Sequence, residues 1–412
     1  MNPLFIPTSL SRFRATRAGL LALVCAGVLR VRCGHVFRFF KNLSRPLSVF
    51  SSSFAGFGQK LPPSPFPVSA STPSRSRFSP TRAAALAAVL LVSPALLVEH
   101  ASAVTYTWNG TTSQYWSVAE NWVGGVVPVS ANTTDIIISG TVNVGTMYPG
   151  STAYTIKSLT FDASNDANTT LSLQQNGNNN TGARNLTFSS NSGNATLTVE
   201  SGSTGNKTID RLTGGTGSAA TIILTSSLDI VHNGSGTLTL GDAVKTSVTG
   251  AGSINKSGTG TLILVGNSTY SGNTTISAGT LKAGSANALS SNSAVSVAAG
   301  AAMDLGGYNN TIKSLSTATG TITNSGASAN LTITSVGSGA AQLFTGNLGL
   351  VLNTSEVFTN TNSTYSGGTY LNSGRLILQS TAVGAGTPGA LTSGRYGTGT
   401  ITLGSGTTSQ AQ

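Results

Sequence analysis

Short runs in which apolar residues recur among polar ones are found along most of the chain, each bounded by Gly, Ser or Asn. The clearest lie at residues 261–265, 274–277 and 280–282, where Leu and Ile are interspersed with Thr, Ser and Lys. In a β-strand successive side chains point to opposite faces, and glycine-rich boundaries are typical of tight turns. The pattern therefore predicts many short strands that each bury one face.

One stretch of the chain occurs twice. The hexapeptide Asn-Ser-Thr-Tyr-Ser-Gly begins at residue 267 and again at residue 362, an offset of 95 residues. Long, imperfect repeats built from short strands favour a solenoid over a closed globule. We predict an all-β solenoid over residues 131–412, with repeats near 236–284 and 359–405. The repeated positions are Gly258, Gly260, Leu262, Leu264, Asn267, Tyr270, Gly272, Gly279, Leu281, Tyr365, Gly367 and Gly374.

The region before the repeats has the same character. No amphipathic helix of ten or more residues stands out, because Gly and β-branched residues interrupt every candidate. The spacing of the strands would also suit a sandwich or a barrel, but the repeats favour stacked coils. The best strand candidates are residues 136–138, 154–161, 170–173, 185–188, 195–199 and 221–224.

Charge divides the chain at about residue 103. Residues 1–103 contain twelve Lys and Arg and one acidic residue, whereas residues 104–412 contain ten of each. The net charge of +11 therefore belongs to the leader, and the remaining body is close to neutral. Binding of nucleic acid would need basic residues clustered on the folded body, so we expect no such partner.

The leader itself has two parts. Residues 1–80 are rich in Arg, Ser, Pro and Phe, and we expect them to be disordered. Three explanations stay open: an extended leader, a transit-like segment, or a region upstream of the true start. Residues 81–103 read as a signal peptide, with an apolar run at 83–98 and an Ala101-Ser102-Ala103 cleavage motif. The alternative, a transmembrane anchor, would need a longer run.

Both cysteines, Cys25 and Cys33, lie in the leader. The body from Val104 onward must therefore hold together by stacking alone, which a long solenoid can do. It also offers no thiolate nucleophile and no zinc site of the Cys type.

Residues 104–130 contain all three tryptophans, Trp108, Trp116 and Trp122. A solenoid needs a cap, because its first coil otherwise leaves an apolar face and a strand edge uncovered. Large aromatic rings suit that role, since each buries a large area. The alternative is a carbohydrate contact, in which the exposed rings would stack on sugar faces.

Catalytic chemistry is poorly represented. His232 is the one histidine of the body, and we expect it to lie on the surface at the turn before Asn233-Gly234. Asp229, His232 and Ser235 resemble a triad in spacing, but positions 229 and 232 of a strand face opposite sides. The closest carboxylate pair, Asp162 and Asp166, reads as a polar loop. We predict no enzyme activity, no cofactor and no metal site.

The Gly-x-Gly-Thr-Leu-x-Leu, Asn-x-Thr-Tyr-Ser-Gly and Ala-Gly-Thr-Leu series resembles the autotransporter-associated β-strand repeat of bacterial secreted passenger proteins. The match is close over residues 258–284 and good over 359–378. The opening Thr107-Trp108-Asn109-Gly110, with Trp116, Trp122 and Pro128, is similar to the start of many such proteins. The resemblance implies a right-handed parallel β-helix at or beyond the outer membrane, with no catalytic residues in the repeat.

Two functions remain in competition. The first is an exported structural or adhesive solenoid, secreted or on a bacterial cell surface, whose partners are the export machinery and a polysaccharide or neighbouring cell. The second is a β-helical polysaccharide lyase or glycosidase, which would need facing carboxylates across a groove. The chain stops at residue 412 inside what reads as a further repeat. We expect a fragment that meets a membrane only through a missing C-terminal anchor.

Overall fold

The computed structural model describes residues 102–149, 153–173, 184–211, 219–244, 246–316, 319–337, 341–355, 362–374 and 397–404. The chain divides into two units, Met1–Ala87 and Ala88–Gln412, and the described residues all belong to the second. The predicted leader at 1–80 and most of the predicted signal peptide, including Ala101, lie outside the described residues.

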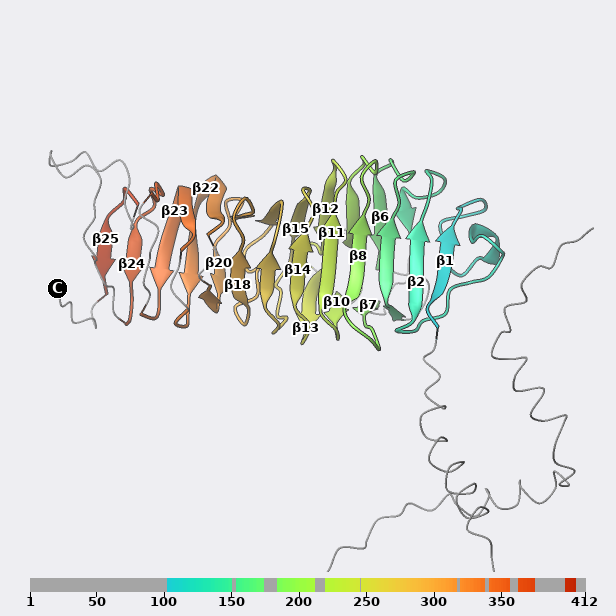
Figure 1. Cartoon of the computed structure of the whole chain (residues 1–412), viewed down its shortest axis with the longest axis horizontal. Helices are drawn as coiled ribbons and strands as arrows, with labels where there is room; N and C mark the ends of the chain where they lie inside the picture. The colour runs from blue at the N-terminus through green and yellow to red at the C-terminus, as the bar shows by residue number, and fades with distance from the viewer. Residues whose placement is uncertain are drawn as a thin grey trace, which may run out of the picture. The chain divides into compact units, whose positions relative to one another are not determined.

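The described part of the chain forms three parallel sheets of nine, four and twelve strands (Figure 1). The nine-stranded sheet contains β1 (Val104–Trp108), β2 (Thr134–Ile138), β5 (Ser158–Phe161), β8 (Ala195–Val199), β11 (Leu228–His232), β14 (Ile254–Ser257), β16 (Thr274–Ile276), β18 (Ala294–Val297) and β21 (Ser314–Leu315). The four-stranded sheet contains β4 (Tyr154–Ile156), β7 (Asn185–Phe188), β10 (Ala220–Leu224) and β13 (Thr246–Gly250).

The twelve-stranded sheet runs through most of the stack. It contains β3 (Thr146–Met147), β6 (Thr169–Ser172), β9 (Lys207–Asp210), β12 (Thr237–Leu240), β15 (Thr261–Leu264), β17 (Thr280–Ala283), β19 (Ala302–Asp304), β20 (Asn310–Ile312), β22 (Thr321–Ile333), β23 (Leu343–Leu352), β24 (Thr369–Leu371) and β25 (Ile401–Leu403). One short 3₁₀ turn, η1 (Ala119–Asn121), precedes β2.

From β2 to β19 successive strands pass from one sheet to the next, whereas β22 to β25 all belong to the twelve-stranded sheet; throughout, each coil adds one rung to the stack (Figure 1). The strand β11, for example, pairs with β8 of the coil before and β14 of the coil after, both in parallel. Every pairing between named strands is parallel, which excludes the antiparallel sandwich that the strand spacing had left open. The chain is thus an all-β parallel β-helix, as predicted.

The alternation of apolar and polar residues explains why the coils stack. Along most strands every second side chain is buried, and buried positions of neighbouring coils coincide in register. Leu238 pairs with Leu262, and Leu262 with Leu281, so that leucines stack from coil to coil inside the helix. The buried apolar side chains form one continuous core, and each coil covers the apolar face of the next.

The strands predicted at 185–188 and 195–199 are found with the same bounds as β7 and β8. The predicted strand at 154–161 is divided at residue 157 into β4 and β5, which belong to different sheets. Within the described residues, no helix has the length and apolar character needed to cross a lipid bilayer.

The four-stranded sheet ends at β13, and the first repeat takes over its place. Thr269 and Ser271 donate backbone hydrogen bonds to the carbonyls of Val248 and Gly250 on β13, both at 2.9 Å. The repeated hexapeptide therefore continues the third side of the coil as an extended segment without forming a regular strand. This places Tyr270 between the two anchoring bonds.

Candidate functional site

The three tryptophans form one aromatic cluster at the start of the stack. Trp122 makes edge contacts with Trp108 and Trp116 at centroid distances of 5.2 and 5.6 Å, and Trp116 contacts Tyr154 in the same way at 5.5 Å. The rings of Trp108 and Trp116 are 0% exposed and that of Trp122 is 1% exposed. Rings that are fully covered cannot stack on a sugar, so their burial favours the cap over the alternative, a carbohydrate contact of these three residues.

The backbone around the cluster covers the outer edge of β1. Trp122 pairs with Trp108 in an antiparallel bridge, and Val123 donates a hydrogen bond to the Thr107 carbonyl at 2.9 Å. Asn121 is 0% exposed, and its amide donates to the Tyr115 carbonyl at 2.9 Å. These bonds occupy part of a strand edge that would otherwise be free to pair with another chain.

The two repeated tyrosines are fully buried, and each needs a partner for its hydroxyl group. Tyr270 bonds to Thr274 at 2.8 Å between the two hydroxyl oxygens, and Tyr365 bonds to Thr369 at 2.6 Å. In both copies the threonine follows the tyrosine by four residues. The repeat therefore contains its own buried Tyr–Thr pair, and the threonine is a member that the sequence pattern alone did not single out.

The repeated glycines are required by close contacts between coils. Gly258 and Gly279 have positive φ angles of 74° and 66°. A Cβ atom at Gly260 would lie 2.6 Å from the His232 ring, and one at Gly279 would lie 2.5 Å from the Gly258 carbonyl oxygen. These distances are too short for any side chain, so glycine is needed at the corner where the coils meet.

The glycine corner encloses a buried ammonium group. Lys256 is 0% exposed, and its Nζ donates to the carbonyls of Ser257 and Gly258 at 2.8 Å and of Ala278 at 3.2 Å. Three acceptors match the three donors of an ammonium group. Burial lowers the pKa of Lys256 to about 8. Lys207 is held in the same way by the carbonyls of Asn165 and Ala167.

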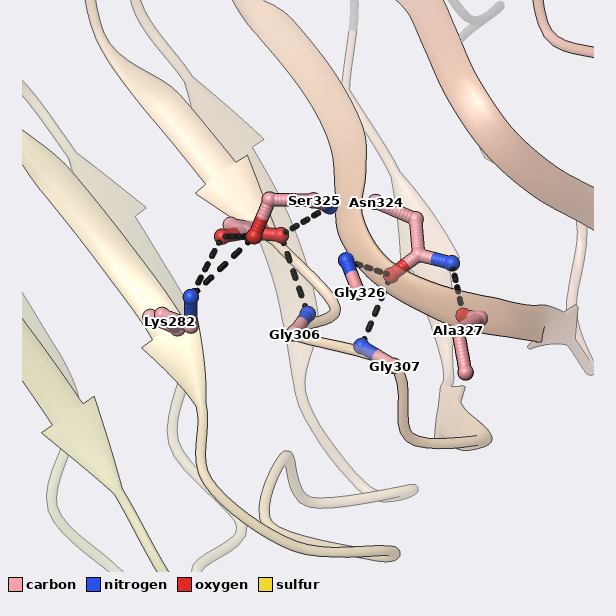
Figure 2. Close-up of polar contacts among 8 residues, drawn as sticks. Lys282, Gly306, Gly307, Asn324, Ser325, Gly326 and Ala327 are labelled. Carbon is pink, nitrogen blue, oxygen red and sulfur yellow. Dashed lines mark hydrogen bonds and ion pairs between the residues drawn. The ribbon is translucent and has the colours of Figure 1, made fainter.

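A second polar cluster joins β17, β19 and β22 (Figure 2). The Lys282 Nζ lies 3.2 Å from the Asp304 carboxylate and donates to the Ser325 hydroxyl at 3.1 Å. Ser325 in turn donates to Asp304 through its hydroxyl at 2.6 Å and its backbone N–H at 2.9 Å, and Gly306 N–H adds a further bond of 2.9 Å. The side chain of Asn324 joins the same turns by accepting from Gly307 at 2.7 Å.

This cluster contains the groups of a serine nucleophile site, but its bonding favours a structural role. Burial works to raise the pKa of Asp304, yet hydrogen bonds from Ser325, Gly306 and Lys282 outweigh it and hold the pKa below its usual value. A carboxylate stabilised in this way is a poor base for activating a hydroxyl. The backbone N–H groups of Gly306 and Gly307 are bonded to side chains, so they do not form an oxyanion hole.

The structure also brings together two carboxylates that are distant in sequence. Asp210 is the last residue of β9 and Asp242 follows β12, in consecutive coils of the same sheet. Burial, and then the charge of Asp242, raise the pKa of Asp210 to about 6. The pair is stacked along one wall, whereas glycoside cleavage needs two carboxylates on opposite sides of the bond. The predicted loop pair, Asp162 and Asp166, is found in a turn at the surface.

His232 is the main correction to the sequence analysis. It was expected on the surface, but it is 0% exposed, because it occupies the last inward position of β11 and Gly260 of the following coil packs on its ring. Asp229 lies on the outward face of the same strand, as predicted, and Ser235 is exposed. The three residues do not form a triad. Among the described residues, no cluster of three metal-binding side chains is found.

Comparisons with known proteins identify the repeated stretch. A family model described as the passenger-associated-transport-repeat matches residues 254–283 and 356–378, the two stretches that contain the Tyr–Thr pairs. The chain is similar to the Adhesin BmaC autotransporter of Brucella suis biovar 1 (strain 1330), with 41% identity over 92 residues. That match covers 21% of this chain and 3% of the relative. No solved structure matches the chain.

Proposed function

We propose that this autotransporter passenger-like repeat protein is an exported adhesive scaffold, secreted or displayed on a bacterial cell surface, without catalytic activity of its own. The observation that supports this best is the similarity to an adhesin autotransporter, in a chain that folds as a parallel β-helix. The buried lysines described above bond to backbone carbonyls, and the buried tyrosines bond to threonines of their own repeat. They serve to hold the stack together, as a scaffold requires.

Export is the first part of the proposal to test. Residues 81–103 would direct the chain to the export machinery, and cleavage after Ala103 would leave Val104 at the N-terminus. Val104 is also the first residue of β1, so cleavage there would leave the first rung intact. N-terminal sequencing of exported protein should begin at Val104. Retention of residues 81–103 in the exported protein would contradict the proposed cleavage.

Adhesion is the second part. The outward positions of the nine-stranded sheet carry hydroxyl, carboxylate and amide groups in register, in the order Thr196, Asp229, Asn255 and Thr275. Such groups suit contact with a neutral polysaccharide or with the surface of a neighbouring cell. Beads coated with the folded chain should be retained under flow on polysaccharide-coated or cell-coated surfaces. Beads coated with heat-denatured chain are the control, and equal retention of the two would overturn the proposal.

The stacked pair Asp210 and Asp242 keeps the enzymatic alternative open to a direct test. We expect no release of reducing ends or unsaturated products from plant or algal polysaccharides. Release that is abolished by Asp210→Asn, but not by Asp166→Asn in the surface turn, would establish the alternative function. The Asp166→Asn variant is a matched control, because it removes a carboxylate that lies outside the pair.

A further inference from the structure

We infer that His232 makes the coils around β11 an acid-sensitive section of the stack, which opens locally as the pH falls below about 6.5. This inference concerns the fold itself and does not depend on the proposed adhesive function.

The first support is the way in which the ring is enclosed. His232 is 0% exposed, and in the described part of the chain neither ring nitrogen has a hydrogen bond of normal geometry. The position of a Cβ at Gly260 would be 2.6 Å from both Cγ and Nδ1, so the following coil lies directly against the ring. A charged imidazolium has two N–H donors, and the backbone of Gly236, which acts on the ring without a hydrogen bond of normal geometry, offers an acceptor to one of them at most.

The second support is the charge of the surroundings. Two ammonium groups act on the ring, those of Lys256 on β14 and Lys207 on β9, and both lysines are 0% exposed. The residue of β8 that pairs with His232 is the apolar Val199. The turns before β12 and β15 contribute glycines to the surroundings of the ring. Asp229 of the same strand faces outward. A proton on His232 would therefore add a third positive charge to an interior that already holds two.

The consequence for the pKa follows from these contacts. Burial and the charges of Lys256 and Lys207 together lower the pKa of His232 to about 4, against the opposing effect of the backbone of Gly236. An opened coil exposes the ring, whose pKa then returns to about 6.5. Between these two values the open form binds one proton more than the closed form. The stability of the closed form is therefore lost as the pH falls from about 6.5 to about 4.

Other titrating groups are separable from His232. Lys207 and Lys256 have pKa values of about 8, so they stay charged throughout this range and add no slope. Asp210 has a pKa raised to about 6, so it works in the opposite direction, because its closed form binds the extra proton. A comparison of the full chain with and without a titrating residue 232 isolates the histidine.

The test is hydrogen exchange of the full chain between pH 4 and 7, corrected for the intrinsic rate of amide exchange. Peptides that cover β11 and β14 should show an opening constant that rises up to about tenfold for each unit of pH below 6.5. In the His232→Gln variant this slope should fall by one proton, while peptides from β22 and β23 change equally in both proteins. Equal slopes at β11 in the two proteins would overturn the inference.

A second measurement keeps the inference falsifiable if the glutamine variant does not fold. Histidine in the wild-type chain can be labelled with ¹³C, and the ring of His232 can be followed by NMR as the pH is lowered. The ring should stay neutral down to about pH 4–5 as long as the coil is closed. Titration of His232 in the folded chain near pH 6.5 would contradict the inference.

Discussion

The two copies of the Asn-Ser-Thr-Tyr-Ser-Gly stretch use the same internal pair but differ in how they are joined to the next coil. In the first copy Thr274, the partner of Tyr270, also bonds to the hydroxyl of Ser293 at 2.8 Å. Ser290 adds a bond of 2.5 Å to the Tyr270 carbonyl. The pair is thus part of a chain of hydroxyl groups that extends into the following coil.

The second copy differs in the described contacts of its threonine. Among the described residues, Thr369 has no hydroxyl partner other than Tyr365, whose carbonyl accepts from the Thr398 backbone at 2.9 Å. Phe344 makes an edge contact with Tyr365 at 5.9 Å, and the Gly397 backbone lies against the same ring. The comparison shows that the repeat specifies the Tyr–Thr pair locally, whereas the neighbouring coil decides how the pair is extended.

Removal of either ring should have the largest effect. Tyr270→Ala and Tyr365→Ala each leave a cavity in a fully buried site, and we expect a loss of about 3–5 kcal/mol in the free energy of local opening. Hydrogen exchange of the two coils measures this loss separately. Tyr308→Ala, at a tyrosine that is 43% exposed, is the control and should cost less than about 1 kcal/mol. A small effect at either buried site would mean that its ring is not packed as described.

The glycines that close the two copies should come next. Gly279→Ala and Gly374→Ala introduce a Cβ at φ angles of 66° and 91°, close to the backbone of the coil before. We expect each to cost about 2–3 kcal/mol. Gly300→Ala is the control, because Gly300 has a similar φ of 80° but nothing within 4 Å of the added atom. Equal costs at all three positions would show that backbone conformation, and not contact between coils, requires the glycines.

The threonine of each copy distinguishes the two networks. Thr274→Val removes a partner from both Tyr270 and Ser293, whereas Thr369→Val removes a partner from Tyr365 alone. We expect both to cost about 1–3 kcal/mol, with the larger loss at Thr274. Local hydrogen exchange is again the measurement. A larger loss at Thr369 would contradict the difference between the two copies.

Removal of the tyrosine hydroxyl should have the smallest effects of the series. The larger loss should now be in the second copy, the reverse of the order expected for the threonine variants. After Tyr270→Phe, Thr274 keeps its bond to Ser293, but after Tyr365→Phe, Thr369 loses its described partner. We expect about 0.5 kcal/mol for the first and about 1.5 kcal/mol for the second. The same order for the valine and phenylalanine variants would show that the bond between Thr274 and Ser293 contributes little.

The fold could be predicted from the sequence because its signals are local. Residues 185–188 and 195–199 alternate in polarity and are bounded by turn residues, so their strands can be located without knowledge of their neighbours. The stacking could be inferred because one stretch is repeated. The division of the predicted strand 154–161 at Lys157 could not be inferred, because it depends on which sheet each half joins.

The residues of the candidate site could not be placed from the sequence alone, because their positions depend on the register in which neighbouring coils stack. His232 precedes Asn-Gly and was expected at the surface, but Gly260 of the next coil covers it. Lys256 was missed because a lysine rarely lies in a core, and its three carbonyl acceptors come together only when two coils stack. Asp210 and Asp242 are likewise distant in sequence and meet only through the stacking of β9 and β12.

The central claim, that successive coils add rungs along one axis, can be tested by distances between spin labels. Thr105, Asn255 and Ser296 share one outward column of the nine-stranded sheet, five strands apart for the first two and seven for the first and last. With Cys25 and Cys33 replaced by Ser, labels at 105 and 255 should be about 24 Å apart, and labels at 105 and 296 about 34 Å apart. A second distance equal to or shorter than the first would contradict the β-helix.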